Sequence, residues 1–105
     1  MSIIHVTQEN FEKEILQSDR KVLLDFWASW CGPCQMLSPI IDQFANEHSE
    51  YVIGKIDVDE EKSLAMKYDI MSIPTLVVLD KGIEKNRSMG VIPKDMILKL
   101  MDTEE

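Results

Sequence analysis

The stretch VLLDFWASWCGPC, residues 22–34, joins an apolar run to two closely spaced cysteines. From Val22 to Trp27 every residue is apolar except Asp25, a pattern typical of a strand that is covered on both faces. After Cys34, apolar residues recur at the spacing of a helix with one apolar face, at Met36, Leu37, Ile40, Ile41, Phe44 and Ala45. The two cysteines therefore lie where a buried strand passes into a helix.

Strand and helix patterns alternate on both sides of this stretch. Short, largely apolar segments predict strands at residues 3–6, 22–27, 51–57 and 75–79, and residues 85–89 are expected as the returning strand of a hairpin. Apolar residues at helical spacing predict helices after Thr7, after Cys34, over residues 59–68 and from Pro93 onward. Helices between strands favour right-handed crossovers, whereas the turn Asp80-Lys81-Gly82 closes a final antiparallel hairpin. We therefore predict an α/β fold, with a five-stranded mixed sheet flanked by four helices.

The chain has 105 residues, a length that fits one domain spanning residues 1–105 with one hydrophobic core. Hydrophobic residues make up 45% of the chain and charged residues 29%, which is a globular and not a disordered composition. The formal net charge of -8 opposes binding to the phosphate backbone of nucleic acids and to anionic lipid surfaces. We therefore expect no nucleic-acid partner and no membrane partner.

Neither the apolar runs nor the N-terminal residues predict passage through a membrane. The uninterrupted apolar runs, such as Leu76 to Leu79, are far shorter than the about 20 residues that a spanning helix needs. Residues 1–7 lack the basic and long apolar regions of a secretory signal. Two cysteines are too few for a secreted disulfide framework, so we expect a cytoplasmic protein.

The chemistry of the cysteines follows from their position at the start of a helix. Unpaired N–H groups and the partial positive charge of a helix N-terminus stabilise a thiolate, which is the nucleophilic form of cysteine. We expect Cys31, at the exposed tip, to attack a disulfide, and Cys34, one shielded turn later, to resolve the mixed disulfide. Their spacing allows a Cys31–Cys34 disulfide. Gly32 leaves room for an incoming disulfide, and Pro33 suits an early helical position.

Three other interpretations of the cysteine pair stay open. A structural disulfide would close a very short loop and stabilise the fold by only about 2 kcal/mol. A zinc site needs about four ligands, and the histidines, His5 and His48, lie elsewhere with no second cysteine pair. Two inert buried thiols are the third alternative, because free cysteine is often buried. We expect no metal site.

Residues 27–34, WASWCGPC, closely resemble the active-site segment of the thioredoxin family. The likeness extends over essentially the whole chain, through Asp25, Pro39, Lys55, Asp57, Ile73-Pro74-Thr75, Gly82 and Gly90. The resemblance implies the thioredoxin fold and a protein-disulfide reductase that works by dithiol–disulfide exchange. It also implies client proteins with disulfides and re-reduction by a thioredoxin reductase that draws on NADPH. We expect a monomer with no bound cofactor.

Asp25 is a single carboxyl group within the apolar strand, where burial would raise its pKa toward neutrality. The resemblance assigns the matching residue a general-base role, in which Asp25 takes a proton from Cys34 as Cys34 attacks. The alternative is a carboxylate that reaches solvent at the end of the sheet. Lys55, in the neighbouring predicted strand, either pairs with Asp25 and tunes the active site or extends into solvent.

The resemblance implies a cis peptide bond between Ile73 and Pro74, beside the two sulfurs, which would expose the Ile73 backbone for pairing with a client segment. The alternative is an ordinary proline at the start of an edge strand. We predict that a mainly apolar surface around Cys31 binds clients. This client-binding rim consists of Trp30, Met71, Ile73, Pro74, Met89, Gly90 and Val91. The alternative is that methionines fill the core, which we expect for Met66, Met96 and Met101.

Gln35 and Met71 stand where basic residues are common in the family. We expect these departures to affect the choice of partner and to leave the chemistry intact. Two rival functions stay open. One is an interaction module whose thiols are incidental, and the other is a net oxidant or isomerase outside the cytoplasm. The dipeptide Gly32-Pro33, which matches reducing members of the family, argues against the oxidant.

Overall fold

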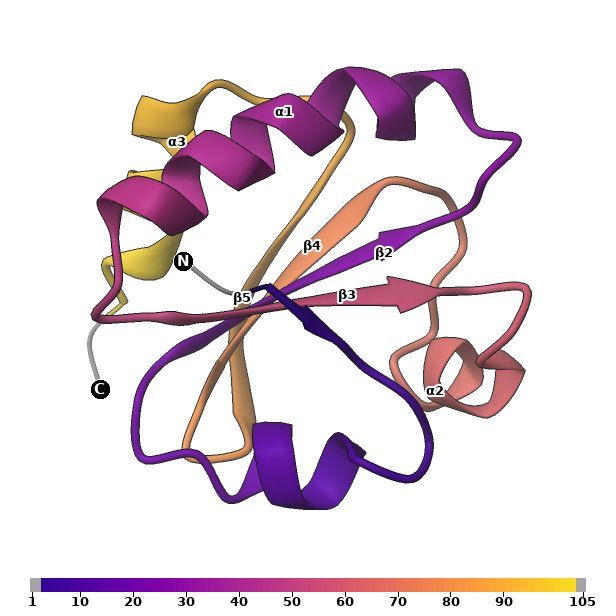
Figure 1. The fold of residues 1–105 in the computed structure, drawn as a ribbon, viewed down its shortest axis with the longest axis horizontal. Helices are drawn as coiled ribbons and strands as arrows, with labels where there is room; N and C mark the ends of the chain where they lie inside the picture. The colour runs from indigo at the N-terminus through magenta and orange to yellow at the C-terminus, as the bar shows by residue number, and fades with distance from the viewer. Residues whose placement is uncertain (1–2, 104–105) are drawn as a thin grey trace.

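The computed structural model of the chain describes residues 3–103, in which five strands form one sheet (Figure 1). The strands are β1 (Ile4–His5), β2 (Val22–Trp27), β3 (Val52–Asp57), β4 (Thr75–Asp80) and β5 (Ile83–Met89). Their order across the sheet is β1-β3-β2-β4-β5, so β2 lies at its centre. β1 and β2 run parallel to β3, whereas β4 is antiparallel to both β2 and β5. The predicted mixed sheet is confirmed.

Helices cover both faces of the sheet (Figure 1). α1 (Gly32–Glu47) and α3 (Lys94–Met101) lie on one face, and the core beneath them contains Leu23, Leu37, Ile41, Phe44, Ile97 and Met101. A short π-helical segment, η1 (Glu12–Leu16), and α2 (Lys62–Lys67) lie on the other face, over Phe11, Ile15, Leu24, Phe26, Leu64 and Tyr68. β2 contributes to both cores because successive side chains of a strand point to opposite faces. The predicted four helices are confirmed.

β4 runs in the direction opposite to the one that a crossover through α2 predicts. α2 has only 6 residues and rises about 9 Å, whereas a strand of β4's length spans roughly 20 Å. α2 is therefore too short to return the chain to the far edge of the sheet, and β4 begins beside the end of β2, with Thr75 opposite Phe26. This brings the segment before Thr75 close to the cysteines, which follow β2 along the chain.

The first helix is shorter than predicted. The side-chain oxygens of Thr7 and Asn10 each accept a hydrogen bond from the other residue's backbone N–H, at 3.3 and 2.9 Å, and they close a turn. Thr7 thus caps this turn, whereas η1 begins later and is closed by the bond from Gln17 N–H to the Glu12 carbonyl. The apolar spacing still has its expected result, because Ile15 is fully buried.

Only one of the three methionines assigned to the core lies there. Met101 is fully buried, but Met66 is 77% exposed and Met96 is 44% exposed, so the prediction is wrong for these two. On α3 the buried positions are Ile97 and Met101, four residues apart. Residues at this spacing share one helix face, which leaves Met96 beside that face and in contact with solvent.

Candidate active site

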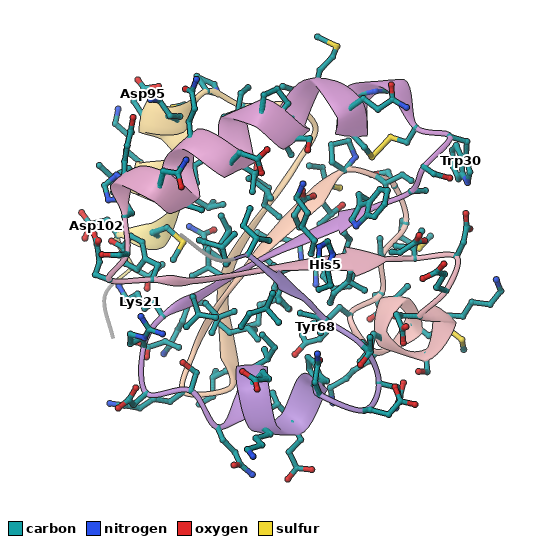
Figure 2. All side chains as sticks on the ribbon, in the orientation of Figure 1. His5, Lys21, Trp30, Tyr68, Asp95 and Asp102 are labelled. Atoms are coloured by element: carbon teal, nitrogen blue, oxygen red, sulfur yellow. A yellow bond between two sulfur atoms is a disulfide. The ribbon has the colours of Figure 1, made fainter. Side chains whose placement is uncertain are left out.

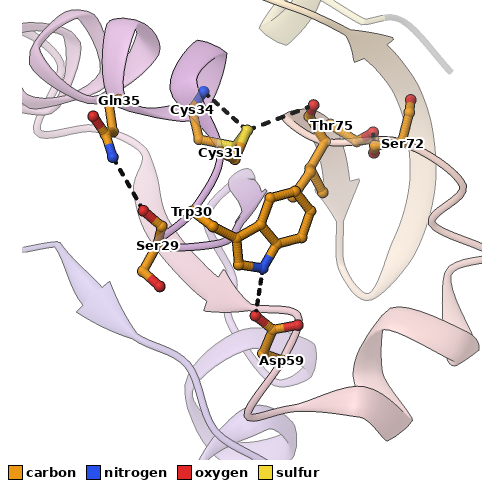
Figure 3. The surroundings of a disulfide bond; sticks show 9 residues. Ser29, Trp30, Cys31, Cys34, Gln35, Asp59, Ser72 and Thr75 are labelled. Carbon is orange, nitrogen blue, oxygen red and sulfur yellow. Dashed lines mark hydrogen bonds between the residues drawn. A yellow bond between two sulfur atoms is a disulfide. The ribbon is translucent and has the colours of Figure 1, made fainter.

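The two cysteines form a disulfide at the N-terminus of α1, which begins at Gly32 (Figures 2 and 3). Their Cα atoms are 5.3 Å apart. Cys31 is the N-cap of the helix, and its Sγ accepts a hydrogen bond from the Cys34 backbone N–H at 3.2 Å. The first turn of α1 holds no acidic residue that would offset the positive end of the helix. This geometry stabilises negative charge on Cys31 Sγ once the pair is reduced.

Both cysteines are buried in this oxidised state, since Cys31 is 5% exposed and Cys34 is 4% exposed. The expectation of an exposed Cys31 beside a shielded Cys34 is therefore wrong for the disulfide form. Cys31 Sγ lies 3.8 Å from the carbonyl oxygen of Ile73, and Trp27, Val58 and Ile73 pack around the pair. A disulfide sulfur carries no proton, so the contact with the Ile73 carbonyl becomes a possible hydrogen bond only in the dithiol.

Asp25 lies within β2 and is 2% exposed, so its carboxylate does not reach solvent at the end of the sheet. Its neighbours across the sheet are Lys55 on β3 and Leu76 on β4. Among the described residues, nothing donates a hydrogen bond to its Oδ1 atom. Burial raises the pKa of Asp25 from 3.8 to about 6, and the positive charge of Lys55 opposes that rise.

A cavity of about 210 Å³ joins the Asp25 carboxyl group to Cys34. Its lining consists of His5, Asp25, Trp27, Cys34, Gln35, Ser38 and Lys55. The cavity is roomy enough for water and contains polar groups that water can bind. A proton can therefore pass between Cys34 and Asp25 by way of water, without direct contact of the two side chains.

Lys55 does not extend freely into solvent, and its positive charge acts on its cross-strand neighbour Asp25, as the tuning alternative expects. Its Nζ atom donates a hydrogen bond to Ser38 Oγ at 2.8 Å, so the side chain is held by α1. Sequence reasoning missed Ser38, although Cys34 and Ser38 are four residues apart and share one face of α1. It also missed His5, which is the neighbour of Lys55 on the other side of β3 and lines the cavity.

The Ile73–Pro74 peptide bond is cis, as the family resemblance implied. Pro74 is buried, and its carbonyl oxygen accepts a hydrogen bond from the Gly90 backbone N–H at 2.9 Å. Gly90 has a φ of 92°, a backbone conformation that favours glycine. The Pro74 segment is thereby fastened to the residue that follows β5.

The client-binding rim falls into two parts. Trp30 is 69% exposed and Met71 is 90% exposed, and together with Ile73 they line a groove of about 400 Å³. The indole N–H of Trp30 donates a hydrogen bond to Asp59 Oδ2 at 2.8 Å (Figure 3), and the side chain stands at the edge of the molecule (Figure 2). The rest of the groove is formed by Val58, Ala65, Ile70 and Ser72. Sequence reasoning did not assign Ala65 and Ile70 to this surface, because both belong to α2 or the turn after it.

Met89 and Val91 form the second part of the rim and do not line the groove. Met89 is 63% exposed and Val91 is 37% exposed. Met89 is the cross-strand neighbour of Thr75, which directly follows Pro74. Both parts of the rim therefore flank the Pro74 segment.

Gln35, at the position that departs from the family pattern, turns away from the sulfurs. Its side-chain amide donates a hydrogen bond to the Ser29 carbonyl oxygen at 3.0 Å (Figure 3). Within residues 3–103, no three side chains of histidine, cysteine, aspartate or glutamate gather as a metal site. In the same range, no helix has the length and apolar character needed to cross a membrane.

Comparison with known proteins agrees with this geometry. The family model for thioredoxin matches residues 2–103. The chain is 47% identical over 97 residues to thioredoxin of Chlorobaculum thiosulfatiphilum, an alignment that covers 91% of this chain and 90% of the relative. It is 44% identical to thioredoxin 2 of Chlorobaculum tepidum, with 91% of this chain and 89% of the relative covered. It is 41% identical to thioredoxin 1 of Synechococcus elongatus, with 92% of each chain covered. A disulfide-forming cysteine pair on a five-stranded, four-helix fold, together with these matches, shows that the chain belongs to the thioredoxin family of thiol–disulfide oxidoreductases.

Proposed function

We propose that this protein reduces the disulfides of client proteins, with Cys31 as the attacking residue, Cys34 as the resolving residue and Asp25 as the general base. The hydrogen bond from Cys34 N–H to Cys31 Sγ, at the positive end of α1, is the observation that carries the assignment of Cys31. Gly32 and Pro33 support the site because they are exposed in the first turn of α1 and leave the approach to Cys31 open.

The reaction begins with both cysteines reduced. The Cys31 thiolate attacks one sulfur of the client disulfide, so that a Cys31–client bond forms and the other client sulfur leaves as a thiolate. Cys34 then gives its proton to Asp25 and attacks Cys31 Sγ. The Cys31–client bond breaks, the second client sulfur leaves, and the Cys31–Cys34 disulfide forms. Two electrons have then passed from the protein to the client, whose thiolates take protons from solvent.

Asp25 suits the base role because its pKa is close to neutral pH. A carboxyl group with a pKa of about 6 is largely ionised at pH 7 and still accepts a proton from an attacking thiol. The cavity that it shares with Cys34 supplies the route. Lys55 supports the site by placing a positive charge near the carboxylate, which lowers the pKa of Asp25 below the value that burial alone would give.

The client-binding rim is the proposed docking surface. The groove between Trp30, Met71 and Ile73 offers apolar contact beside Cys31, and methionine adapts to clients of different shape. Pro74 and Gly90 hold the adjoining backbone, and Met89 and Val91 extend the apolar surface on its other side. Gln35 and Met71 leave this surface without the basic side chains common in the family, which would change the reductase and clients that fit it.

We further propose that a thioredoxin reductase returns electrons from NADPH to the Cys31–Cys34 disulfide, and that the protein acts in the cytoplasm as a monomer. Residues 1–105 are proposed to form one domain, whose ends at 1–2 and 104–105 lie outside the described residues.

A disulfide-reduction assay tests the proposed function. Wild type should reduce a disulfide-bonded test protein with dithiothreitol as the electron donor, and Cys31→Ser should not. Asp25→Asn should slow the resolving step at pH 7, since no carboxylate then takes the Cys34 proton. An unchanged resolving rate in Asp25→Asn would remove the base role. A measured reduction potential above that of the cytoplasm would favour the oxidant alternative.

A further inference from the structure

Lys55 lies between two cavities that offer its ammonium group different partners. The inner cavity contains the single carboxyl group of Asp25. An outer cavity of about 220 Å³ is lined by three acidic residues, Asp57, Glu60 and Glu61. Lys55 and His5 line both. The position of one flexible ammonium group therefore decides which carboxylates receive its charge.

The hydrogen bond to Ser38 holds this ammonium group on the inner side. Ser38 Oγ lies 2.8 Å from Lys55 Nζ and belongs to α1, which covers the inner cavity. Ser38 does not line the outer cavity. Among residues 3–103, the ion pairs found do not include Lys55, so the bond to Ser38 is the contact that fixes the amine.

Lys55 would move outward without this restraint. The lysine ammonium is strongly hydrated and sits on a flexible stem, so it gains solvation when it leaves a partly buried position. Three acidic residues line the outer side, whereas the inner side offers one carboxyl group that is protonated for part of the time, so the outer side holds more negative charge. Its departure would leave Asp25 buried with an unpartnered oxygen and with less countercharge.

We propose that Ser38 is a positioning residue, whose hydroxyl group keeps the Lys55 ammonium beside Asp25 and away from Asp57, Glu60 and Glu61. This proposal rests on the proposed function for the importance of Asp25, but its physical content, the charge that Asp25 receives, is measured independently of activity.

A titration of Asp25 must be distinguished from the contributions of the other groups around it. From α1, Cys34 faces the cavity and does not titrate while it is in the disulfide. From β1, His5, an ionisable side chain, lines the cavity. From β4, the neighbour is Leu76, which carries no charge. The oxidised protein with His5→Gln is therefore the background in which Asp25 is best observed.

The experiment follows the Asp25 carboxyl carbon by NMR across pH in the oxidised protein. Ser38→Ala should move the titration midpoint to higher pH by roughly half a unit, and Lys55→Met by about one unit, because each reduces the positive charge near the carboxylate. Adding Ser38→Ala to Lys55→Met should move the midpoint no further. Ser29→Ala is the matched control, because Ser29 is exposed and contacts Gln35 through its main-chain carbonyl oxygen and not through its hydroxyl group. Its titration midpoint should equal that of the parent.

The outcomes decide the proposal. The proposal is overturned if the Asp25 titration midpoint of Ser38→Ala is unchanged or lower than that of the parent. It is also overturned if Ser38→Ala shifts the midpoint equally with Lys55 present and in Lys55→Met. An unchanged midpoint in Lys55→Met also overturns it, and this arm does not depend on how Ser38→Ala folds. Failure of the base role appears elsewhere, as an unaltered resolving rate in Asp25→Asn, and so the two failures are distinguishable.

Discussion

Asp25 and Lys55 are direct neighbours across β2 and β3, while the Lys55 ammonium donates its hydrogen bond to Ser38 on α1. The carboxyl group thus stays buried beside a positive charge that a third residue holds. Its pKa stays near neutrality because burial outweighs the attraction of Lys55. A direct ion pair would lower the pKa of Asp25 further and make the carboxylate a weaker base.

Asp25→Asn should stabilise the oxidised protein at pH 8 and change its stability little below pH 4. The pKa of Asp25 is raised on folding from 3.8 to about 6, so the folded state binds more protons between these values. The folded protein therefore loses stability as the pH rises through this window, and the loss reaches about 3 kcal/mol once the pH is above the window. Urea unfolding of both proteins at pH 4 and pH 8 measures the effect. An equal change at the two pH values would contradict the shifted pKa.

Cys34→Ser should accumulate mixed disulfides with clients on Cys31. Serine cannot attack the Cys31–client bond, so the reaction stops after its first step. Gel electrophoresis without reductant, followed by mass spectrometry of the trapped bands, measures the adducts. Cys31→Ser is the control and should trap far fewer. Absence of adducts in Cys34→Ser would show that Cys34 is not the resolving residue.

Cys31 in the reduced protein should react with iodoacetamide at pH 7 roughly ten times faster than glutathione does, because the helix N-terminus and the Cys34 N–H stabilise its thiolate. The rate of alkylation, followed by mass spectrometry against glutathione in the same tube, gives the ratio. Cys34, measured in Cys31→Ser, should react slowly. A Cys31 rate equal to that of glutathione would contradict the thiolate assignment.

Met71→Glu should raise KM for a client protein roughly three- to tenfold and leave kcat nearly unchanged, because it places a charge on the apolar groove beside Cys31. Met96→Glu is the matched control, since Met96 is also exposed but lies on α3 and outside the groove. Steady-state reduction of the client measures both constants. Equal effects of the two substitutions would argue against docking at the groove.

Gly54→Ala should destabilise the fold by about 1–3 kcal/mol, because a Cβ atom at this buried position of β3 would overpack the core. That atom would lie 2.7 Å from Val6 Cγ2 and 3.2 Å from Leu24 Cδ2. Gly32→Ala is the control, since a Cβ atom there meets nothing within 4 Å. Denaturant unfolding of both variants measures the difference. A Gly54→Ala protein as stable as wild type would show that Val6 repacks freely.

The sequence predicts the features that depend on neighbours along the chain. The apolar run around Asp25 predicts a buried central strand, and the following helix places Cys31 at its N-terminus. The direction of β4 depends on how far α2 carries the chain, which the apolar pattern does not encode. The burial of Cys31 depends on Ile73, a residue distant in sequence that packs against it.

The side-chain partner of Lys55 lies beyond sequence reasoning for a similar reason. Ser38 and Lys55 belong to different layers of the fold and meet only when α1 packs on the sheet. A serine in the middle of a helix predicts no particular contact, because its hydroxyl group forms hydrogen bonds equally well with the backbone, with side chains or with water. The strand-to-helix pattern placed Cys31 and Cys34, and the family resemblance supplied the cis bond before Pro74, but neither suggested Ser38 as a partner of Lys55.

The antiparallel entry of β4 brings the Ile73–Pro74 segment against cysteines that precede it by some forty positions along the chain. The reactive environment is thus a product of tertiary assembly and does not reside in the short peptide that carries the sulfurs. A denatured copy keeps both thiols but loses the oriented helix and the apolar cover. Its cysteines should then react with disulfides only as fast as ordinary thiols do.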